Sequence, residues 1–598
     1  MYERIAQELS RRNFVTGATA AVAATAATAS IALADDAKAD DTEAAEDTAA
    51  PENRWQSQAG AAWRQAPEAI DEADIADGGE YDVVIVGGGQ SGTWCARSCA
   101  MNGLKVAVLE ALAEEDFLYV GGEVGHVNSE WAMAHGTEKI DEVELLNEIN
   151  RRNAGRGNQR LIKDWVYRSG ELLDWAIEDL NDSEWMENVE NVHVYGRDND
   201  TEMVMDASGY KYWLSTLVFR PFSGSGGDWD WGPKMMTHQR EAAIEEGATW
   251  MFNHIGYYLE QDVDGKVCAI IAQNEEDESY IRLNVNLGVV LAAGDYSANE
   301  DMLRDINDEY RHEAEAYGDI EYAKASGMFT RREGDGIKLG VWAGGHVEVG
   351  PHAGMNNGQV DVSAPWGSGF PILNQNGLRF CDEVAGGAEG SGYMIPRQPR
   401  GYVASFADAN WQEVTKRMPP CHSCVDVTHG VAFDGIDGKV ADVEATQPGD
   451  APNEDTGLYC ANTLEELVDL LGIWNDEQKA TALAELQRYN EMASAGRDED
   501  FGADSRIIKP LDTAPFYAVI AQSDNIICGL CQTTGLDVDH KHRVLDSTLN
   551  PIDGLYAIGN NAGNRYCVQY ATPLSGMSLG FCLTEGMLLG RQLAGVEE

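Results

Sequence analysis

Apolar residues are concentrated in residues 81–86, Tyr-Asp-Val-Val-Ile-Val, a short run that is typical of a buried parallel strand. A turn rich in glycine follows, and residues 91–101 then have the pattern of a helix. A second apolar run at 105–109 ends on the acid Glu110. The order of strand, glycine turn, helix, strand and acid predicts a unit that binds a dinucleotide.

Each glycine of this turn has a distinct role in a dinucleotide-binding site. Gly87 permits the tight turn, Gly89 lets the backbone approach a pyrophosphate, and Gly92 lets the helix pack on the strand. Free N–H groups at the helix N-terminus can bind the phosphates, and Glu110 can bind an adenosine ribose. The cofactor contacts predicted here are Gly87, Gly89, Gln90, Ser91, Gly92, Glu110 and Ala111. The alternative is a merely structural turn, which chance would produce somewhere among 63 glycines.

Helical and strand patterns follow in blocks along the rest of the chain. Strand patterns run from 249 to 291, and Asp264-Gly265 is the turn of a hairpin within them. Helices are expected at 141–153, 160–180, 463–472 and 476–492.

The first 34 residues have the pattern of a targeting signal. Ser10-Arg11-Arg12-Asn13-Phe14-Val15 is a twin-arginine motif, and a mildly apolar Ala/Thr stretch leads to a small-residue end at Ala34. We therefore expect cleavage after Ala34 and export of the folded protein by the twin-arginine pathway to the cell envelope or a periplasm-like space. The alternative is a chance pair of arginines before an alanine-rich tail.

Composition sets limits on the partners. Acidic residues outnumber basic ones 100 to 43, so the formal net charge of -57 argues against nucleic acid as a partner. Residues 35–79 are acidic and show little apolar periodicity, which predicts a disordered or loosely attached linker. A chain of 598 residues exceeds the size of one core, so we expect at least two domains.

Five later motifs resemble a known family when they are taken in order with residues 81–110. The motifs are VVLAAGDYSANEDML (289–303), EGDGIKLGVWAGGHVE (333–348), LNQNGLRFCDE (373–383), GLYAIGNNAG (554–563) and SGMSLGFCLTEGMLLG (575–590). Together they are similar to the FAD-binding flavoproteins of the fumarate reductase and 3-ketosteroid dehydrogenase superfamily, and the resemblance covers Tyr81 to Gly595.

This resemblance implies an α/β fold: a discontinuous, Rossmann-like FAD-binding domain with an inserted α+β capping domain. The expected division is a twin-arginine signal peptide (1–34), a linker (35–79), the first part of the FAD domain (80–350), the cap (351–521) and the second part of the FAD domain (522–598). Non-covalent FAD is the implied cofactor. The further FAD contacts that it implies are Gly121, Gly122, Asn128, Ser129, Ala293, Gly294, Asp335, Gly559, Asn560, Met577, Ser578 and Leu579.

The chain departs from the fumarate reductases at the places where these keep their substrate-binding side chains. The two expected arginines are replaced by Gly387 and Pro573, and a histidine is replaced by Cys531. A buried dianion needs cationic donors, so we expect a neutral or aromatic substrate instead of a short dicarboxylate. The stretch from Tyr570 to Pro573 is similar to the Tyr-Ala-Gly-Pro stretch of ketosteroid dehydrogenases.

Several polar side chains near these motifs are candidates for delivering a proton. A positioned tyrosine or arginine can protonate the carbon next to the one that receives a hydride. Each of them alone could instead be a packing or ion-pair residue. The candidate catalytic residues are Tyr393, Arg397, Tyr570, His352 and Arg565.

Eleven cysteines do not form a recognisable disulfide framework. The pairs Cys421/Cys424 and Cys528/Cys531 could bind zinc or an iron–sulfur cluster, but ordinary burial of cysteine is the simpler interpretation, and no metal ligand is assigned.

The leading hypothesis is an exported FAD-dependent oxidoreductase. It would reduce an activated C=C bond of a small organic acceptor by hydride transfer from flavin N5, with electrons from an external donor such as a membrane-linked cytochrome, as in anaerobic respiration. One alternative is a ketosteroid-like dehydrogenase that runs in the oxidative direction. The other is a flavin electron-transfer protein without a substrate of its own.

Overall fold

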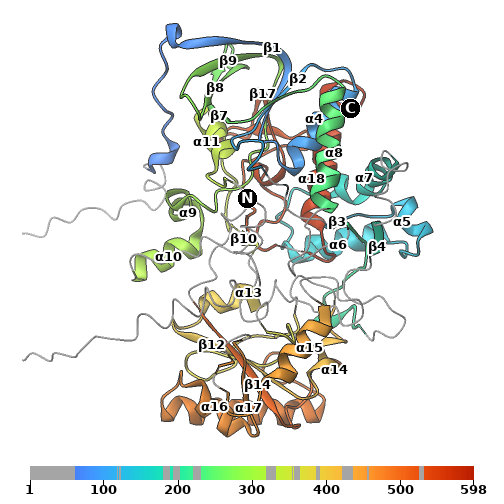
Figure 1. Cartoon of the computed structure of the whole chain (residues 1–598), viewed down its shortest axis with the longest axis vertical. Coiled ribbons are helices and arrows are strands. Elements are labelled where there is room, and N and C mark those ends of the chain that lie inside the picture. Colours follow the sequence, from blue (N-terminus) through green and yellow to red (C-terminus); the bar gives the residue numbers. More distant parts are fainter. Residues whose placement is uncertain are drawn as a thin grey trace, which may run out of the picture.

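The computed structural model arranges the chain in two lobes, one above the other (Figure 1). It describes residues 61–117, 119, 123–178, 189–192, 203–219, 231–317, 331–352, 354–355, 364–385, 391–419, 435–450, 452–453, 457–523, 531–570 and 572–597. The expected signal peptide and residues 35–60 of the expected linker lie outside these ranges.

The main lobe is built on an eight-stranded sheet with a parallel centre. Its main path has the order β16-β17-β9-β1-β2-β6, with the β7–β8 hairpin attached to β9. The strands are β1 (Ile75–Val86), β2 (Val106–Leu109), β6 (Thr249–Met251), β7 (His254–Gln261), β8 (Val267–Asn274), β9 (Tyr280–Leu291), β16 (Arg543–Leu545) and β17 (Pro551–Ala557). Strand β1 pairs in parallel with both β2 and β9, and β17 pairs in parallel with β9. Strands from both ends of the chain therefore form one sheet, which confirms the discontinuous Rossmann-like domain.

The apolar run of β1 is continuous because both faces of the sheet are covered. Val83 and Ile85 pack beneath α4, whereas Val84 and Val86 face the opposite core with residues of β8 and α11. Cys95 and Cys99 of α4 lie in the first of these cores, so they face the sheet. The helices of the sheet are α4 (Gln90–Met101), α8 (Trp231–Glu245), α11 (Asp335–Trp342) and α18 (Met577–Leu593), and α9 (Glu300–Ile306) and α10 (Asp308–Tyr317) follow β9.

Part of the segment expected to be a linker is structured, which corrects the expectation for residues 61–79. The buried indole of Trp63 donates a hydrogen bond to Asp305 at 3.0 Å, and the 3-10 turns Ala62–Arg64 and Glu72–Asp74 lead into β1. Strand β1 begins at Ile75, which pairs with Tyr280, and not at Tyr81. Contacts with residues far along the chain hold this segment, so a local pattern could not reveal them.

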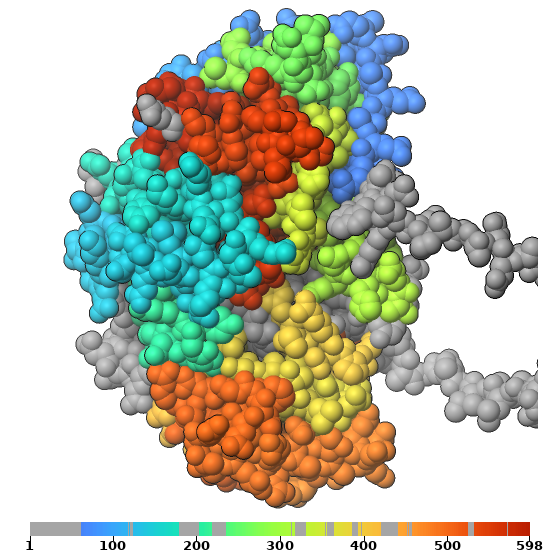
Figure 2. Space-filling model, turned by 180° about the vertical axis from the view of Figure 1, so that it is seen from behind, coloured from blue at the N-terminus to red at the C-terminus, as the bar shows by residue number. Residues whose placement is uncertain are grey.

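A small three-stranded sheet adjoins the N-terminal end of α18. Its order is β3-β5-β4, and the strands are β3 (Glu123–Gly125), β4 (Val189–Val192) and β5 (Thr216–Phe219). Beside it lie α5 (Glu130–Ala134), α6 (Glu142–Arg152) and α7 (Gln159–Glu178). In Figure 2 this part, in cyan, lies against the C-terminal part of the chain, in red. Among the described helices, none is long and apolar enough to cross a membrane.

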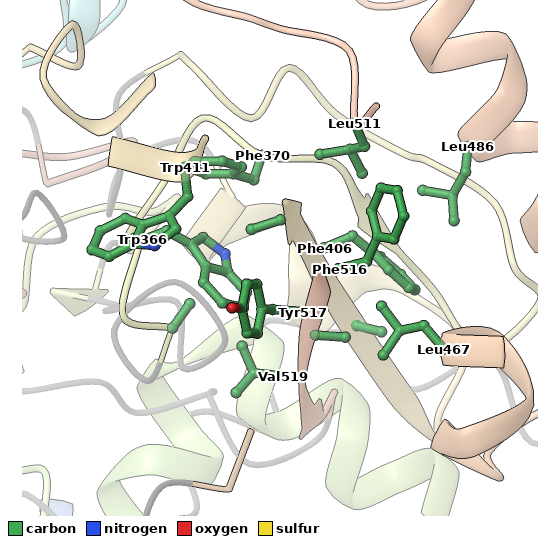
Figure 3. Close-up of a cluster of buried hydrophobic side chains, with 14 of the residues drawn as sticks. Trp366, Phe370, Phe406, Trp411, Leu467, Leu486, Leu511, Phe516, Tyr517 and Val519 are labelled. Atoms are coloured by element: carbon green, nitrogen blue, oxygen red, sulfur yellow. The ribbon is translucent and has the colours of Figure 1, made fainter. Parts of the chain in front are cut away.

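The cap lobe, which we define as the elements from β11 to β14, has a core of its own. Its antiparallel sheet has the order β11-β12-β14-β13, with β11 (Ile372–Leu373), β12 (Tyr402–Asp408), β13 (Tyr459–Ala461) and β14 (Phe516–Gln522). Its helices are α13 (Ser391–Met394), α14 (Trp411–Thr415), α15 (Gly435–Ala445), α16 (Leu464–Leu471) and α17 (Asp476–Ala495). Figure 3 shows Phe406, Trp411 and Phe516 among the side chains that fill this core. The inserted α+β cap is thus confirmed as a fold, while its exact boundaries stay predictions.

Two short strands join the lobes. The chain passes toward the cap lobe through β10 (Gly354–Met355) and returns through β15 (Cys531–Gln532), and these two strands pair antiparallel. The junction therefore places Met355 and Cys531 beside the C-terminal motif.

Candidate active site

The carboxyl ends of β1, β9 and β17 lie side by side, because Val86 pairs with Leu291 and Leu291 pairs with Ala557. The glycine turn follows β1, residues 292–294 follow β9, and the 3-10 turn Gly559–Asn561 follows β17. In open α/β sheets, ligands bind outside the carboxyl ends of the strands. Three predicted cofactor segments thus meet at one edge of the sheet.

The three glycines of the turn differ in the space around them. A Cβ atom on Gly92 would lie 2.0 Å from the carbonyl oxygen of Gly87, and one on Gly87 would lie 2.5 Å from that of Ala292. A Cβ atom on Gly89 would have no atom within 4 Å. The outer glycines therefore allow close packing, while the middle one borders free space at the N-terminus of α4, which fits a pyrophosphate.

Glu110 occupies the place expected for a ribose-binding acid. Its carboxylate accepts hydrogen bonds from the backbone N–H of Gly88 at 2.9 Å and of Leu112 at 3.0 Å. Burial raises the pKa of Glu110, although these N–H groups oppose the shift. Beside Gly88 lies Trp250, whose buried indole N–H has no hydrogen-bond partner in the described part of the chain. Sequence patterns did not single out Trp250, but its free donor also fits a polar nucleoside.

Asn561 fixes the geometry of this edge. Its side-chain oxygen accepts a hydrogen bond from Ala293 N–H at 2.7 Å, and its amide group donates one to the carbonyl oxygen of Gly294 at 2.6 Å. The side chain thereby ties the turn after β17 to the turn after β9. We predicted its neighbour Asn560 as a cofactor contact and missed Asn561, although both belong to the GNNAG motif.

The N-terminus of α18 is packed tightly against β3. Gly576, with φ +71°, precedes the helix, and its carbonyl oxygen accepts a hydrogen bond from Gly125 N–H at 2.8 Å. Next to it, the buried hydroxyl of Ser575 has no hydrogen-bond partner within the described ranges. Met577, Ser578 and Leu579 form the first turn, whose N–H groups can bind the N1 and O2 edge of a flavin. The donor set of this edge therefore fits FAD.

Two other predicted cofactor contacts, Asn128 and Ser129, already have protein partners. Asn128 bonds to the backbone of Ile140 and to Glu142, and Ser129 caps α5 and donates to Asp174. Their assignment as FAD contacts stays a prediction.

Asp335, another predicted FAD contact, also has protein partners. Its carboxylate pairs with Arg331 at 3.0 Å and Lys338 at 3.1 Å, and Gly334 takes the N-cap position without a side-chain bond. Two cations thus lie within one helical turn of the acid, and the assignment of Asp335 as an FAD contact stays a prediction. Gly121 and Gly122 lie outside the described residues.

Two of the predicted catalytic tyrosines lie together. The hydroxyl of Tyr393 accepts a hydrogen bond from the backbone N–H of Tyr570 at 2.6 Å. The ring of Tyr570 lies 4.7 Å from that of Tyr566, and the hydroxyl of Tyr570 interacts with the side chain of Ser578 in the first turn of α18. Burial, followed by the neighbouring Tyr566, raises the pKa of Tyr570 well above its usual value. Tyr570 is therefore a neutral hydroxyl donor beside the predicted flavin edge.

Of the other catalytic candidates, only Arg565 lies near the two tyrosines, with its guanidinium carbon 5.5 Å from the ring of Tyr566. Arg397 is 58% exposed and forms an ion pair with Glu309 of α10 at 2.6 Å. The ring of His352 bonds through Nε2 to the carbonyl oxygen of Glu348 at 2.9 Å. Arg565 is fully buried beside α18, and its guanidinium group donates to Asn560 at 3.0 Å.

The positions that replace the dicarboxylate-binding side chains are apolar where they are described. Pro573 is buried, and its carbonyl oxygen accepts a hydrogen bond from the backbone N–H group of Trp213 at 2.9 Å. The thiol of Cys531 lies 3.9 Å from the sulfur of Met355, and burial raises its pKa to about 12. Gly387 and the cysteines at 421, 424 and 528 lie outside the described residues, so the possibility of a metal at the cysteine pairs stays untested.

Comparison with known proteins agrees with this geometry. A family model described as an FAD binding domain matches residues 82–579. The vinyl phenol reductase of Lactiplantibacillus plantarum is 23% identical over 543 residues, which cover 86% of this chain and 96% of that protein. The fumarate reductase (cytochrome) of Shewanella frigidimarina is 23% identical over 527 residues, which cover 86% of this chain and 77% of that protein.

The fold also matches a solved structure. The 3-ketosteroid-delta4-(5alpha)-dehydrogenase from Rhodococcus jostii RHA1, in complex with 4-androstene-3,17-dione, superimposes with a TM-score of 0.62. The match has 18% identity and covers 89% of this chain and all of that one. The predicted superfamily and FAD as cofactor are confirmed. Because the family model spans most of its length, the chain belongs to the FAD binding domain family, as an FAD-dependent oxidoreductase related to reductases and dehydrogenases of C=C and C–C bonds.

Proposed function

We propose that this oxidoreductase reduces an activated C=C bond of an organic acceptor other than a short dicarboxylate. The observation that carries the proposal is the buried, neutral hydroxyl of Tyr570 beside the first turn of α18. A neutral O–H group suits a carbonyl or phenol oxygen better than a carboxylate, which needs a cation. The vinyl phenol reductase among the relatives supports an acceptor that carries no carboxylate.

The surroundings of Tyr570 favour an apolar acceptor. Tyr570 shares one core with Met355, Cys531 and Tyr566, and Tyr393 and Trp213 pack against the same core. At the position where fumarate reductases hold a carboxylate with an arginine, this chain has the buried Pro573. An aromatic or otherwise apolar molecule would lose little solvation free energy there, whereas a dianion would lose much.

The residues have separable roles in this proposal. Tyr570 donates a hydrogen bond or a proton to the acceptor, and Tyr393 holds the backbone of Tyr570 in place. The cap lobe excludes water from the reacting atoms. Hydride for the reduction comes from N5 of the bound FAD. Electrons reach the FAD from a separate donor, for which a cytochrome linked to a membrane is our proposal.

We also propose that the protein works outside the cytoplasm. This rests on the twin-arginine motif at Arg11 and Arg12, which directs folded, cofactor-loaded proteins to export. FAD would then be inserted before export.

Anaerobic photoreduction followed by a panel of acceptors tests the function. Reoxidation of the reduced protein by an enone, or by an enoate that is not a dicarboxylate, would support the proposal. Bleaching of the oxidised protein by a saturated ketone would indicate a dehydrogenase that runs in the oxidative direction. If neither class reacts, the protein is an electron carrier without substrate chemistry of its own, and the proposal is wrong.

A further inference from the structure

A fully buried cation lies between the GNNAG turn and α18. The side chain of Arg565 has no exposed surface. Its Nε donates to the carbonyl oxygen of Ala562 at 3.2 Å, and its Nη2 donates to the side-chain oxygen of Asn560 at 3.0 Å. Its Nη1 has no hydrogen-bond partner among the residues that the structure describes. A buried guanidinium group with a free donor is costly unless an acceptor is supplied.

The acid nearest to Arg565 is Glu585, but the two side chains do not form a hydrogen bond. Glu585 projects from α18 and is also buried, and its Oε2 accepts a hydrogen bond from Gly559 N–H at 2.8 Å. Its Oε1 lies 3.9 Å from Nε of Arg565, which is too far for a hydrogen bond. Burial raises the pKa of Glu585, and the guanidinium group of Arg565 opposes this shift. Glu585 does not satisfy the free donor of Arg565.

The cation lies beside the turn that begins α18. Its guanidinium carbon is 5.8 Å from the ring centre of Phe581 and 5.5 Å from that of Tyr566. Phe581 is in the second turn of α18, and the ring of Tyr566 packs against that of Tyr570 at 4.7 Å. Arg565 bonds to Asn560 and Glu585 bonds to Gly559, and both partners belong to the turn after β17, which is one of the three predicted cofactor segments.

We propose that Arg565 and Glu585 set the electron affinity of the bound flavin. Arg565 stabilises negative charge at the N1 and O2 edge of the ring, and Glu585 opposes this effect. A reduced flavin carries negative charge at that edge, so a nearby cation favours reduction and a nearby anion disfavours it. The inference rests on FAD binding and is independent of the acceptor, so it stands or falls separately from the proposed function.

Sulfite titration of the oxidised holoprotein tests the pair without any electron donor or acceptor. Sulfite adds to flavin N5: a sulfur–nitrogen bond forms, and the displaced electron pair moves to the N1 and O2 edge. The dissociation constant for sulfite, read from the loss of visible flavin absorbance, therefore reports the electrostatic potential at that edge.

The two charges predict shifts of opposite sign. Arg565→Gln should weaken sulfite binding about tenfold, and Glu585→Gln should tighten it by a similar factor, as expected for one buried unit charge several ångströms away. Arg565→Lys keeps the charge and should restore most of the affinity. Arg488→Gln, which removes an exposed arginine paired with Asp500 on the cap lobe, is the matched control and should change nothing.

The direction of the shift in sulfite affinity still decides the outcome if one variant fails to fold or to retain FAD. If Arg565→Gln fails to fold or to retain FAD, the Glu585→Gln variant carries the test alone. Unchanged or weaker sulfite binding by Glu585→Gln would overturn the proposal. Shifts of the same sign in both variants would overturn it as well, because that result would indicate a general loss of packing.

Discussion

The hydroxyl of Tyr393 accepts a hydrogen bond from the backbone N–H of Tyr570 and donates one to the carbonyl oxygen of Gly354, each at 2.6 Å. Tyr393 belongs to the short helix α13 of the cap lobe, Gly354 to the strand that leads into it, and Tyr570 to the C-terminal motif. One hydroxyl thus ties three segments together. Because its hydroxyl proton is used for this bond, Tyr393 positions Tyr570, and Tyr570 remains the candidate proton donor.

We predict that the two tyrosines differ when each is changed to Phe. Tyr570→Phe should slow reoxidation of the reduced protein by its acceptor by roughly 10²- to 10⁴-fold, the usual contribution of a positioned proton donor. Tyr393→Phe leaves one backbone N–H and one carbonyl group unpaired, so we expect a smaller loss of about tenfold together with lower thermal stability. Stopped-flow reoxidation and thermal unfolding measure the two effects.

Arg397→Ala is the control for this pair. The exposed ion pair between Arg397 and Glu309 contributes little, so the rate should stay within about twofold of that of the unchanged protein. Equal losses in all three variants would mean that the proton donor is not Tyr570.

The glycine turn predicts a separation of folding from cofactor binding. Gly89→Val places its side chain in the free space beside the turn, so the protein should fold but retain little FAD. Gly92→Ala brings Cβ to 2.0 Å from the carbonyl oxygen of Gly87, so it should disturb the fold itself. Circular dichroism and the amount of flavin released by acid precipitation distinguish the two.

The same precipitation tests how the flavin is held. All of the flavin should appear in the supernatant as FAD, because we predict non-covalent binding. Colour that stays in the pellet, or FMN in place of FAD, would show that the site was misinterpreted.

Features that depend on neighbouring residues could be predicted from the sequence. The turn from Gly87 to Gly92, the helix predicted at 476–492 and observed at Asp476–Ala495, and the hairpin at Gly265 all follow from short patterns of glycine and apolar periodicity. The discontinuous sheet followed from the resemblance of distant motifs.

Features that depend on distant partners could not be predicted. Trp63 is ordered by Asp305, which lies 242 residues away, and Asn561 acts through Ala293 and Gly294. Arg397 belongs to a promising motif, yet it points toward Glu309 at the surface. Local composition carries no information about such pairs, because the fold alone decides which side chains meet.

A buried acid predicts a pH effect on stability. Glu348 accepts hydrogen bonds from the N–H groups of Gly535 and Asn564, and burial raises its pKa from 4.5 to about 7. In the folded protein it therefore keeps its proton over a pH range in which the unfolded chain has lost it. The stability gained from this is full below the unfolded pKa and is lost as the pH rises toward about 7.

Comparison with Glu348→Gln isolates this effect, since glutamine does not titrate. The difference in unfolding free energy between the two proteins should fall by up to about 1.4 kcal/mol per pH unit between about pH 5.5 and about pH 7, and then level off. Denaturant unfolding at a series of pH values measures it. A difference that does not change with pH would contradict a raised pKa for Glu348.

Export can be tested at the two arginines. Changing Arg11 and Arg12 to lysine together should leave folded, flavin-loaded protein in the cytoplasm, because the motif requires the arginine pair. Cell fractionation with immunodetection and flavin assay measures this. Normal export of the double variant would rule out the twin-arginine route.

We propose that the site beside Tyr570 accepts a neutral or aromatic molecule and not a short dicarboxylate. This proposal rests on Pro573, which replaces an arginine expected in fumarate reductases, and on the neutral hydroxyl of Tyr570 nearby. An added arginine offers a matched gain-of-function control: Pro573→Arg should improve the use of fumarate relative to the unchanged protein, provided that FAD content is equal.

The most direct measurement is the rate at which the photoreduced protein is reoxidised without oxygen, by fumarate and by a neutral aryl enone at equal concentration. We predict that the enone reoxidises the flavin at least about a hundredfold faster, since Pro573 supplies no cation for a carboxylate at its position, and a buried, unpaired carboxylate costs several kcal/mol. Rapid reoxidation by fumarate, with succinate as the product, would contradict the proposed preference for a neutral acceptor.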